Sequence, residues 1–410
     1  MVKNKTHAKL GDIGKVLMCK RILKSQTANT GEVPFFKIST FGGKADTFIS
    51  QDLYAEYKRE YSHPKKGDVL ISAAGTVGKT VIYDGKPAYF QDSNIVWIEN
   101  CETKVLNSYL YYFYQTEPWL TTKGSTITRI YNNDLRSIGF SYPLLTVQQK
   151  VVNVLSNIDK KITLNNKINT ELEAMAKLIY DYWFVQFDFP DANGKPYKSS
   201  GGKMIYNEAL KREIPDNWEG GSCSSLFKFN PTLSIKKGEI ASHLDMNALP
   251  TSGYMTKNVK KKPFSGGMKF QNGDVVVARI TPCLENGKTG LISLLDDNEI
   301  GFGSTEFIVL RGKSFDLKCF GACLARSEKF REFSISKMTG TSGRKRVNYT
   351  ALELYKMPIP DETLLKDFEE RIAPLFDKMT KNTRENQKLS EFRDWLLPML
   401  MNGQVTVKDA

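Results

Sequence analysis

The chain repeats itself, because its two halves carry similar strings in the same order. Residues 67–84 resemble residues 273–292: each stretch opens with Gly-Asp-Val and continues to a Gly-Lys-Thr. Later positions match in the same order, and the second copy gains a few residues along the way. These matches are Phe90 with Phe302, Gly124 with Gly340, Leu135 with Leu352, Pro143 with Pro360, and Asp159-Lys160 with Asp377-Lys378. Self-similarity over this length predicts two copies of one structural unit, the second enlarged by loop insertions.

Each copy divides into a strand-rich part and a helical part. The strand-rich parts contain much Gly, Thr, Ser and Asn around short apolar runs, which predicts strands joined by turns. The helical parts nearly lack glycine, and their apolar residues recur at helical spacing. We therefore expect an α+β fold with two globular mixed α/β domains, each followed by a long helix. The expected segments are domain 1 at 1–145, a helix at 146–188, a linker at 189–203, domain 2 at 204–362, a helix at 363–403 and a tail at 404–410.

The apolar seams of both predicted helices are interrupted near their centres. Asn165 breaks the first seam, and Asn382 and Asn386 break the second. Buried asparagines can fix the register of paired helices, so these residues either pair across the seam or face solvent. Pro374 lies inside the second pattern, where proline is expected to kink the helix or mark a restart.

Positive charge is confined to the predicted globular domains. The chain of 410 residues has a formal charge of +13 and a pI near 9.2. Residues 1–145 carry 19 basic and 13 acidic side chains and residues 189–362 carry 26 and 19, whereas both helices are neutral. This partition favours domains that touch a polyanion such as DNA and helices that touch protein. Ordinary solvated surface charge is the alternative.

The sequence lacks the marks of membrane or secreted proteins. No apolar run approaches the roughly 18 residues that a membrane helix needs, and the N-terminal stretch has no apolar core behind its positive charges. Six scattered cysteines and three histidines predict reduced thiols and no metal site. We expect a cytoplasmic protein that makes no contact with a membrane.

Residues 73–80, Ala-Ala-Gly-Thr-Val-Gly-Lys-Thr, superficially match a phosphate-binding loop. Such a loop must open a helix, but this one runs into the strand-like Val81-Ile82-Tyr83. No dinucleotide fingerprint follows a strand, and no Asn-Pro-Pro or Asp-Pro-Pro motif of amino-methyltransferases is present. We therefore predict no catalytic, cofactor-binding or metal-binding residues in this chain.

Nearly the whole chain resembles the specificity subunit of a type I restriction-modification system. The resemblance rests on the order domain, helix, domain, helix and on residues 180–218, YDYWFVQFDFPDANGKPYKSSGGKMIYNEALKREIPDNW. Gly75-Thr76-Val77-Gly78-Lys79 and Pro374-Leu375-Phe376 are similar to recurring strings of this family. It implies two target-recognition domains in a pseudo-twofold repeat, each reading half of a bipartite DNA target. It also implies two long antiparallel coiled-coil helices that separate the domains and set the gap.

The resemblance also implies partners that supply the chemistry. Two modification (methyltransferase) subunits would use S-adenosylmethionine, and restriction subunits would use ATP and Mg for translocation and cleavage. The chain itself would be a non-catalytic subunit that binds double-stranded DNA. Two other readings stay open: a coiled-coil scaffold that joins two protein-binding domains, and a free-standing DNA-modifying enzyme.

Candidate DNA-binding residues are hydroxyl, amide and basic side chains in the predicted loops, because these groups bond base edges and phosphates. In domain 1 they are Ser72, Thr76, Lys79, Gln91, Ser93, Asn94, Ser125, Thr126, Thr128 and Arg129. In domain 2 they are Arg279, Thr281, Lys288, Ser304, Thr305, Ser342, Arg344, Lys345 and Arg346.

Overall fold

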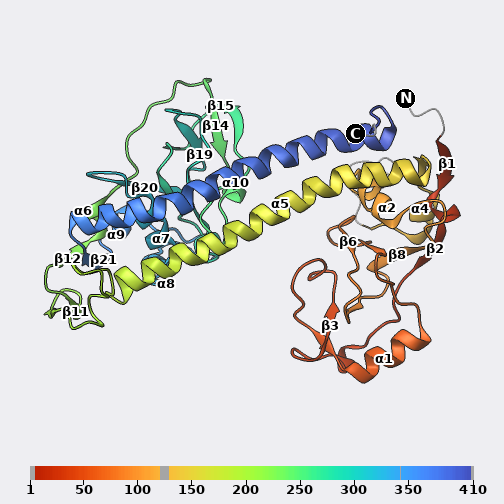
Figure 1. Ribbon diagram of the computed structural model, residues 1–410, viewed down its shortest axis with the longest axis horizontal. Coiled ribbons are helices and arrows are strands. Elements are labelled where there is room, and N and C mark those ends of the chain that lie inside the picture. The colour runs from red at the N-terminus through yellow and green to blue at the C-terminus, as the bar shows by residue number, and fades with distance from the viewer. Residues whose placement is uncertain (1–4, 121–128, 342, 408–410) are drawn as a thin grey trace. The chain divides into compact units, whose positions relative to one another are not determined.

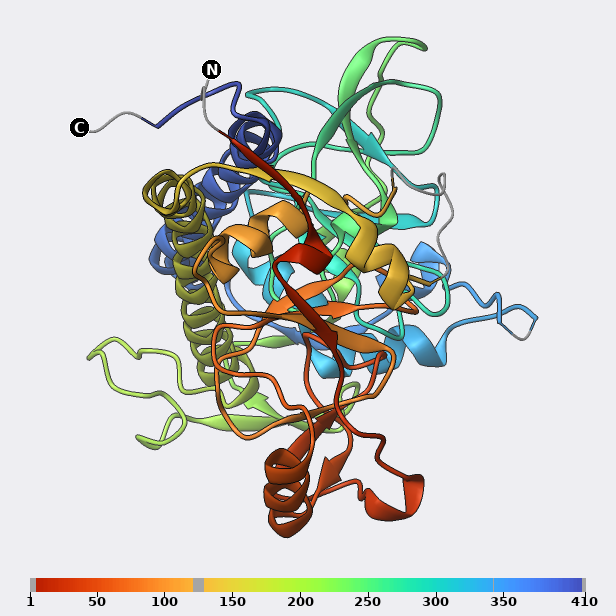
Figure 2. The ribbon, with the colours of Figure 1, turned by 90° about the vertical axis from the view of Figure 1, so that its right-hand side faces the viewer.

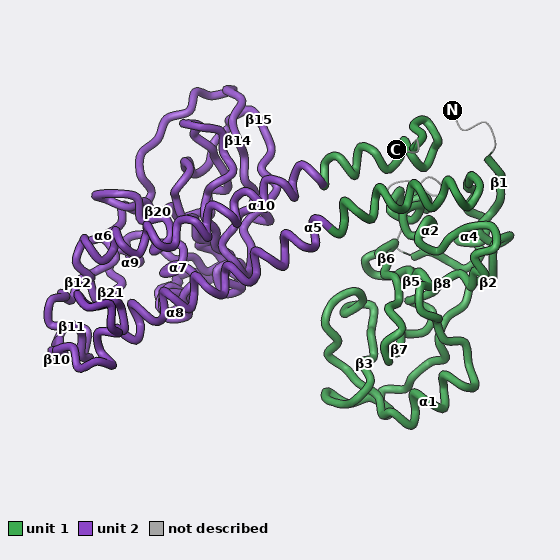
Figure 3. The backbone as a smooth tube through the Cα atoms, in the orientation of Figure 1, with its two compact units in different colours: residues 1–160, 390–410 green, residues 161–389 purple. Residues whose placement is uncertain are grey.

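The computed structural model describes residues 5–120, 129–341 and 343–407. The chain forms two compact units (Figure 3). Unit 1 comprises residues 1–160 and 390–410, and unit 2 comprises residues 161–389. Each unit combines helices with small sheets, as the α+β prediction requires. No helix in the described part of the chain is long and apolar enough to cross a membrane.

Unit 1 is built on two small sheets and a two-stranded ribbon (Figure 1). Helix α1 lies at one end of the unit in both ribbon views (Figure 1, Figure 2). The antiparallel sheet has the order β2 (Gly14–Leu17), β8 (Ile95–Asn100), β5 (Val69–Ser72), β6 (Thr80–Ile82). The second sheet has the order β4 (Phe48–Ile49), β3 (Val33–Phe36), β7 (Tyr89–Phe90), and the ribbon pairs β1 (Thr6–Lys9) with β9 (Gly139–Tyr142). Its shorter helices are α1 (Gln51–Glu60), α2 (Asn107–Tyr114), α4 (Asn132–Ser137), η1 (Leu10–Asp12) and η2 (Lys24–Gln26).

Unit 2 contains sheets of the same kind. The antiparallel sheet has the order β13 (Phe227–Phe229), β20 (Phe307–Gly312), β17 (Val275–Ala278), β18 (Thr289–Leu291). The second sheet has the order β15 (Lys260–Pro263), β14 (Ile240–Leu244), β19 (Gly301–Gly303), β16 (Met268–Phe270). Two ribbons pair β12 (Glu219–Ser222) with β21 (Lys356–Ile359) and β10 (Met204–Asn207) with β11 (Arg212–Pro215). The shorter helices are α6 (Cys223–Leu226), η4 (Met246–Ala248), α7 (Lys318–Arg326), α8 (Glu328–Ser336) and α9 (Tyr349–Glu353).

The strand connections of the two units correspond, except that the second sheet of unit 2 has an additional edge strand, β16. In the sheets β2-β8-β5-β6 and β13-β20-β17-β18, the first, second, third and fourth strands along the chain occupy the same positions. In the second sheets, β3 pairs with β7 and β14 with β19 in parallel, whereas the neighbouring pairs β3–β4 and β14–β15 are antiparallel. The repeated strings of the sequence therefore coincide with a repeated strand topology.

The two long helices occur close to where they were expected. Helix α5 spans Leu145–Tyr180 and continues as a π-helical segment, η3, over Asp181–Val185. Helix α10 spans Glu362–Asn402 and runs through Pro374 without interruption. The predicted restart at Pro374 is therefore wrong. Phe368, Ile372 and Phe376 are fully buried on either side of the proline, so tertiary packing holds the helix across it.

Within unit 2, α5 and α10 run antiparallel and bond through asparagines. Asn165 Nδ2 donates to Asn386 Oδ1 over 2.9 Å, so of the two alternatives left open for Asn165 the structure shows pairing across the seam. Asn382 instead pairs with Asn169, to which it donates over 2.8 Å. Residue numbers rise on one helix as they fall on the other, which defines the antiparallel direction.

Within unit 1, the helix pair is joined by a charged contact. Arg393 Nη1 of α10 donates to Asp159 Oδ1 of α5 over 2.9 Å, and the hydroxyl of Tyr112 on α2 donates to the other carboxylate oxygen over 2.7 Å. The start of α5 and the end of α10 also contribute Leu155 and Leu397 to the core of unit 1. Both helices are thus integral parts of this unit.

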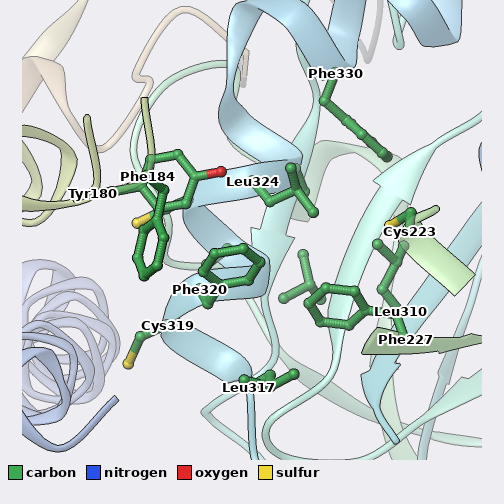
Figure 4. Close-up of a cluster of buried hydrophobic side chains, with 14 of the residues drawn as sticks. Tyr180, Phe184, Cys223, Phe227, Leu310, Leu317, Cys319, Phe320, Leu324 and Phe330 are labelled. Atoms are coloured by element: carbon green, nitrogen blue, oxygen red, sulfur yellow. The ribbon is translucent and has the colours of Figure 1, made fainter. Parts of the chain in front are cut away.

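The largest core of unit 2 joins the helices to the antiparallel sheet. Tyr180 and Phe184 meet Phe320 of α7, with the Phe184 and Phe320 ring centroids 4.9 Å apart (Figure 4). Beside Phe320, Phe227 and Leu310 extend the same cluster onto the paired strands β13 and β20 (Figure 4). Removing these aromatic surfaces from water is the main force that fixes the helices on the sheet.

The expected linker at 189–203 is a folded loop in the structure. Phe189 stacks on Tyr197 at 4.8 Å and on Trp218 at 5.3 Å between ring centroids. Asp188 Oδ1 accepts a hydrogen bond of 2.7 Å from the backbone of Ser199 and closes the loop. The polar composition that predicted a linker reflects its exposed turn residues, whereas the aromatic residues anchor it.

Candidate nucleic-acid interface

Three loop segments of unit 1 meet at one end of the β2-β8-β5-β6 sheet. Ala73, which follows β5, donates from its backbone to the carbonyl of Asn94 over 2.7 Å and accepts from the amide of Ile130 over 2.8 Å. Ala74 and Arg129 form an isolated antiparallel bridge. The turn after β5, the segment before β8 and the Arg129 segment are thereby fixed side by side.

The same hydrogen bonds recur in unit 2. The backbone amide of Arg279, which follows β17, donates to the carbonyl of Glu306 over 3.0 Å, and the Arg279 carbonyl accepts from the amide of Val347 over 2.9 Å. Ile280 bridges Arg346, as Ala74 bridges Arg129. Both units therefore present an arginine-bearing segment between the same two loops. We call these regions the unit 1 interface and the unit 2 interface.

The unit 2 interface is strongly basic. Arg346 pairs with the Glu306 carboxylate, with 2.7 Å between Nη2 and Oε1, and this carboxylate raises the pKa of Arg346. Arg344 and Lys345 are exposed. The backbone of Lys345 donates to Thr281 Oγ1 over 3.1 Å, which holds the basic segment against the loop after β17.

Arg279 is set deeper in the unit 2 interface. Its side chain is half-buried, and its Nε has no hydrogen-bond partner among the described residues. Ser304 Oγ accepts from the backbone of Glu306 over 3.1 Å and shapes the neighbouring turn, while Thr305 is exposed. The interface thus combines fixed turns with exposed donors, as a base-reading surface needs.

In the unit 1 interface Arg129 is held differently. Its Nη2 donates to the carbonyl of Ser93 over 3.1 Å, and its guanidinium carbon lies 5.8 Å from the centre of the Tyr131 ring. Thr76 is exposed, and Ser93 and Asn94 are half-buried. The predicted residues Ser125, Thr126, Thr128 and, in unit 2, Ser342 lie outside the described residues.

Several predicted DNA-binding side chains stabilise turns in the structure. Ser72 is buried; its hydroxyl donates to the carbonyl of Thr76 and accepts from the amide of Lys79 over 2.9 Å. Gln91 Oε1 accepts from the amide of Ile38 over 2.9 Å. These groups are satisfied internally, so their polarity serves the fold of the loop.

The repeated lysine of the Gly-Lys-Thr strings has one structural role in both units. Lys79 Nζ donates to the carbonyl of Phe41 over 2.6 Å, and Lys288 Nζ donates to the carbonyl of Met246 over 2.9 Å. Strands β6 and β18 begin directly after these lysines, so each Gly-Lys-Thr leads into a strand, as expected for residues 73–80.

Sequence reasoning missed Glu306, the carboxylate that pairs with Arg346. It directly follows Ser304 and Thr305, and the hydrogen bonds described above make it the counterpart of Asn94. The prediction considered only hydroxyl, amide and basic side chains, so it left out the acidic Glu306, which orients Arg346.

Comparison with known proteins identifies the family. Residues 3–174 and 215–391 match the family described as Type I restriction modification DNA specificity domain. A putative type I restriction enzyme specificity subunit of Haemophilus influenzae, S.HindORF215P, is 56% identical over 163 residues, which span 40% of this chain and 42% of that relative. The match thus covers less than half of that relative's length. The MjaIX specificity subunit of Methanocaldococcus jannaschii is 22% identical over 98% of both chains.

A solved structure shows the same fold. The S subunit of a type I restriction-modification system from M. genitalium aligns with a TM-score of 0.56 at 15% identity, covering 97% of this chain and 96% of that one. The expected resemblance to specificity subunits of type I restriction-modification systems is confirmed. With both halves matched, the chain belongs to the type I restriction modification DNA specificity domain family.

Proposed function

We propose that the chain gives a type I restriction-modification complex its DNA sequence specificity by reading a bipartite target, one half-site with each interface. The observation that carries this proposal is the shared hydrogen-bond frame, in which Arg129 and Arg346 occupy equivalent positions between equivalent loops. Two like surfaces with different side chains are suited to two different half-sites. Arginine is the side chain best suited to bidentate bonds with guanine.

In this proposal, pseudo-twofold related recognition domains are separated by α5 and α10, which act as a ruler for the gap between the half-sites. Two modification subunits with S-adenosylmethionine would methylate the target, and restriction subunits with ATP and Mg would translocate and cleave DNA. The complex would act in the cytoplasm. The proposed domain boundaries stay those of the sequence: 1–145, 146–188, 189–203, 204–362, 363–403 and 404–410.

Among the predicted DNA-binding residues, we propose as contacts ten whose side chains are exposed or half-buried at the interfaces. In unit 1 these are Thr76, Ser93, Asn94 and Arg129, and in unit 2 they are Arg279, Thr281, Thr305, Arg344, Lys345 and Arg346. Ser72, Lys79, Gln91, Lys288 and Ser304 would support them through the turns.

The test is Arg344→Ala in the complex of the chain with its modification subunits. Since Arg344 is exposed and its side chain makes no interaction with the other described residues, its removal should leave the fold intact. Binding to the DNA target, identified by selection from random duplexes, should weaken by about 1–3 kcal/mol. The preference for particular bases should be relaxed in one half-site only. Unchanged affinity across a salt series would remove Arg344 from the interface.

The ruler part has its own test. Inserting seven residues into α5 after Asn165 and seven into α10 before Asn386 lengthens each helix by about 10 Å while nearly preserving its facing side. The selected half-sites should keep their sequences and move apart by roughly three base pairs. An unchanged gap would contradict the ruler and leave the half-site reading intact.

A further inference from the structure

The outer face of one sheet in unit 2 carries a row of basic side chains that the interfaces do not include. The register of the β15-β14-β19-β16 sheet aligns Lys260, His243, Phe302 and Lys269 across its four strands. Side chains alternate along a strand, so Lys262 lies on the same face as Lys260. We call Lys260, Lys262 and Lys269 the lysine face.

Burial identifies this face as the outer one. On the opposite face, Leu244 and Phe270 are fully buried in the core between the two sheets of unit 2. Lys260 and Lys262 are exposed, while His243 and Lys269 are half-buried. The sheet therefore presents its basic row to solvent.

The lysine face is not neutralised. Lys261 belongs to the other face, where its Nζ pairs with Asp296 over 2.7 Å and Glu299 over 2.8 Å. Within the described parts of the chain, none of the three lysines of the face forms an ion pair. Lys269 Nζ lies 5.2 Å from the centre of the Phe264 ring, a contact that keeps its charge.

The aromatic side chains support a firm surface beneath these charges. The His243 and Phe302 ring centroids are 4.9 Å apart, and Phe264 meets Phe302 at 5.1 Å. Phe302 is almost fully buried under its neighbours. The backbone that carries the lysines is therefore anchored, which lowers the entropy lost when a ligand binds.

The lysine face adjoins the unit 2 interface. Strand β19 ends at Gly303 and leads directly into Ser304 and Glu306 of that interface. Strands are spaced by about 4.8 Å, so Lys260 starts two strand spacings, roughly 10 Å, from Phe302. A duplex held at the interface would meet these ammonium groups next.

The corresponding sheet among the described residues of unit 1, β4-β3-β7, has no such basic row. There Phe36 pairs with Phe90 where His243 pairs with Phe302, and the edge strand β4 consists of Phe48 and Ile49. The nearby Lys37 is neutralised by Asp46 at 2.9 Å. The basic row is thus a feature that distinguishes the second copy from the first.

We propose that the lysine face binds the phosphate backbone of duplex DNA beside the half-site read by unit 2, independently of base sequence. This rests on the proposed function, because the duplex is brought to the face by the interface. The competing explanation is that lysines on the edge strands β15 and β16 merely prevent pairing with another chain. Protecting the sheet edges does not require the lysines to lie on one face of the sheet, whereas binding one DNA backbone does.

The test uses a triple variant and a control with the same change of charge. The test variant combines Lys260→Gln, Lys262→Gln and Lys269→Gln. The control combines Lys228→Gln, Lys313→Gln and Lys356→Gln, which are exposed lysines of the same unit. Lys228 and Lys313 lie towards the end of β20 opposite to Glu306. Both variants are assayed in the full complex against the selected target and a random duplex over a salt series.

Phosphate contacts predict a shallower dependence of log affinity on log salt for the test variant, by about 0.9 per lysine that contacts a phosphate. Affinity for target and random duplexes should fall by the same factor, and the control should match the wild type. A test variant with the same affinity and salt slope as the control overturns the proposal. So does a test variant whose only change is self-association. If the wild type does not prefer its target, the proposed function fails instead, and the salt slopes on random DNA still decide the role of the lysine face.

Discussion

Asn382 of α10 donates a 2.8 Å hydrogen bond from Nδ2 to Oδ1 of Asn169 on α5, and both side chains are buried between the helices. Asn169 uses its own amide group to donate to Thr383 Oγ1 over 3.2 Å. One helical turn away, Asn165 donates to Asn386. Because a buried amide loses its partners when the helices slip, this ladder selects one antiparallel register.

Replacing one member of the ladder should therefore destabilise unit 2. Asn169→Leu leaves the Asn382 amide buried without its acceptor, and we expect the free energy of unfolding to fall by about 1–3 kcal/mol. Urea titration of the purified chain measures this change. The double variant with Asn382→Leu should recover most of the loss, because no orphaned polar group remains. A single variant as stable as the wild type would contradict the role of the ladder.

The sequence predicted the polar interruptions of the helices better than their pairing. Asparagines inside apolar seams are a visible pattern, but the partner of each depends on the register and rotation of two helices packed on a domain. Asn382 thus meets Asn169, a residue that the seam analysis did not single out. The effect of Pro374 was likewise overridden by the burial of Phe368 and Phe376, which no local rule contains.

Glu369 provides a pH-dependent contribution to stability. Its carboxylate on α10 accepts from the amides of Cys319 over 3.0 Å and Phe320 over 2.7 Å at the start of α7. Burial raises the pKa of Glu369 to about 7, above the ordinary value of 4.5. Between pH 4.5 and pH 7, the Glu369 carboxyl is therefore protonated in the folded state but ionised in the unfolded state. The Glu369 contribution to stability is therefore greatest below pH 4.5, and we expect it to fall by about 3 kcal/mol as the pH rises to 7.

The variant Glu369→Gln tests this contribution, because the amide keeps the size of the side chain and one acceptor but does not titrate. Urea unfolding at pH 5 and pH 8 should show a smaller difference in the variant than in the wild type. Equal differences in both proteins would assign the pH dependence to other groups.

The repeated Gly-Asp strings make a second comparison within one chain. Asp274 is buried and forms a bidentate pair with Arg311, with both N to O distances 2.7 Å. Its counterpart Asp68 instead accepts from the neutral amide of Asn107 over 3.3 Å. Each aspartate also caps its own turn, through Gln271 or Lys65.

Asp274→Ala should therefore lower the free energy of unfolding by about 3 kcal/mol, since it leaves the Arg311 charge without its partner. Asp68→Ala should lower it less, by about 1–2 kcal/mol, because Asp68 loses only hydrogen bonds from neutral donors. Chemical denaturation of the two variants under the same conditions gives the comparison. The reverse order of stability would show that the Asp274 pair does not compensate its own desolvation.

The Glu306 carboxylate is expected to restrain DNA binding by partly neutralising Arg346. Glu306→Gln removes this charge and keeps the shape of the side chain. Affinity for random duplex DNA should rise, and the salt dependence should steepen by up to about 0.9 if Arg346 then takes a phosphate. Fluorescence anisotropy over a salt series measures both quantities, and an unchanged slope would place Arg346 away from the DNA backbone.

The candidate interfaces were only partly accessible to sequence reasoning. The positions of loops at strand ends could be predicted, since glycine-rich turns punctuate the strands, whereas their contact with DNA stays a prediction. Which side chains they expose depends on how each turn closes and what it meets. Ser72 and Lys79 look like DNA-binding residues in sequence, but the Ser72 hydroxyl bonds within its own loop and the Lys79 ammonium group bonds the carbonyl of Phe41. The lysine face escaped notice because the strand register decides which of the closely spaced lysines share a face, and the sequence alone does not show that register.

The central claim is that one chain reads two half-sites at a fixed separation. The most direct measurement is selection of binding sites from random duplex DNA at physiological salt, using the chain purified with the modification subunits proposed as its partners. The account predicts two short half-sites separated by a constant number of unspecified base pairs. A single contiguous site, or no enriched sequence, would contradict it.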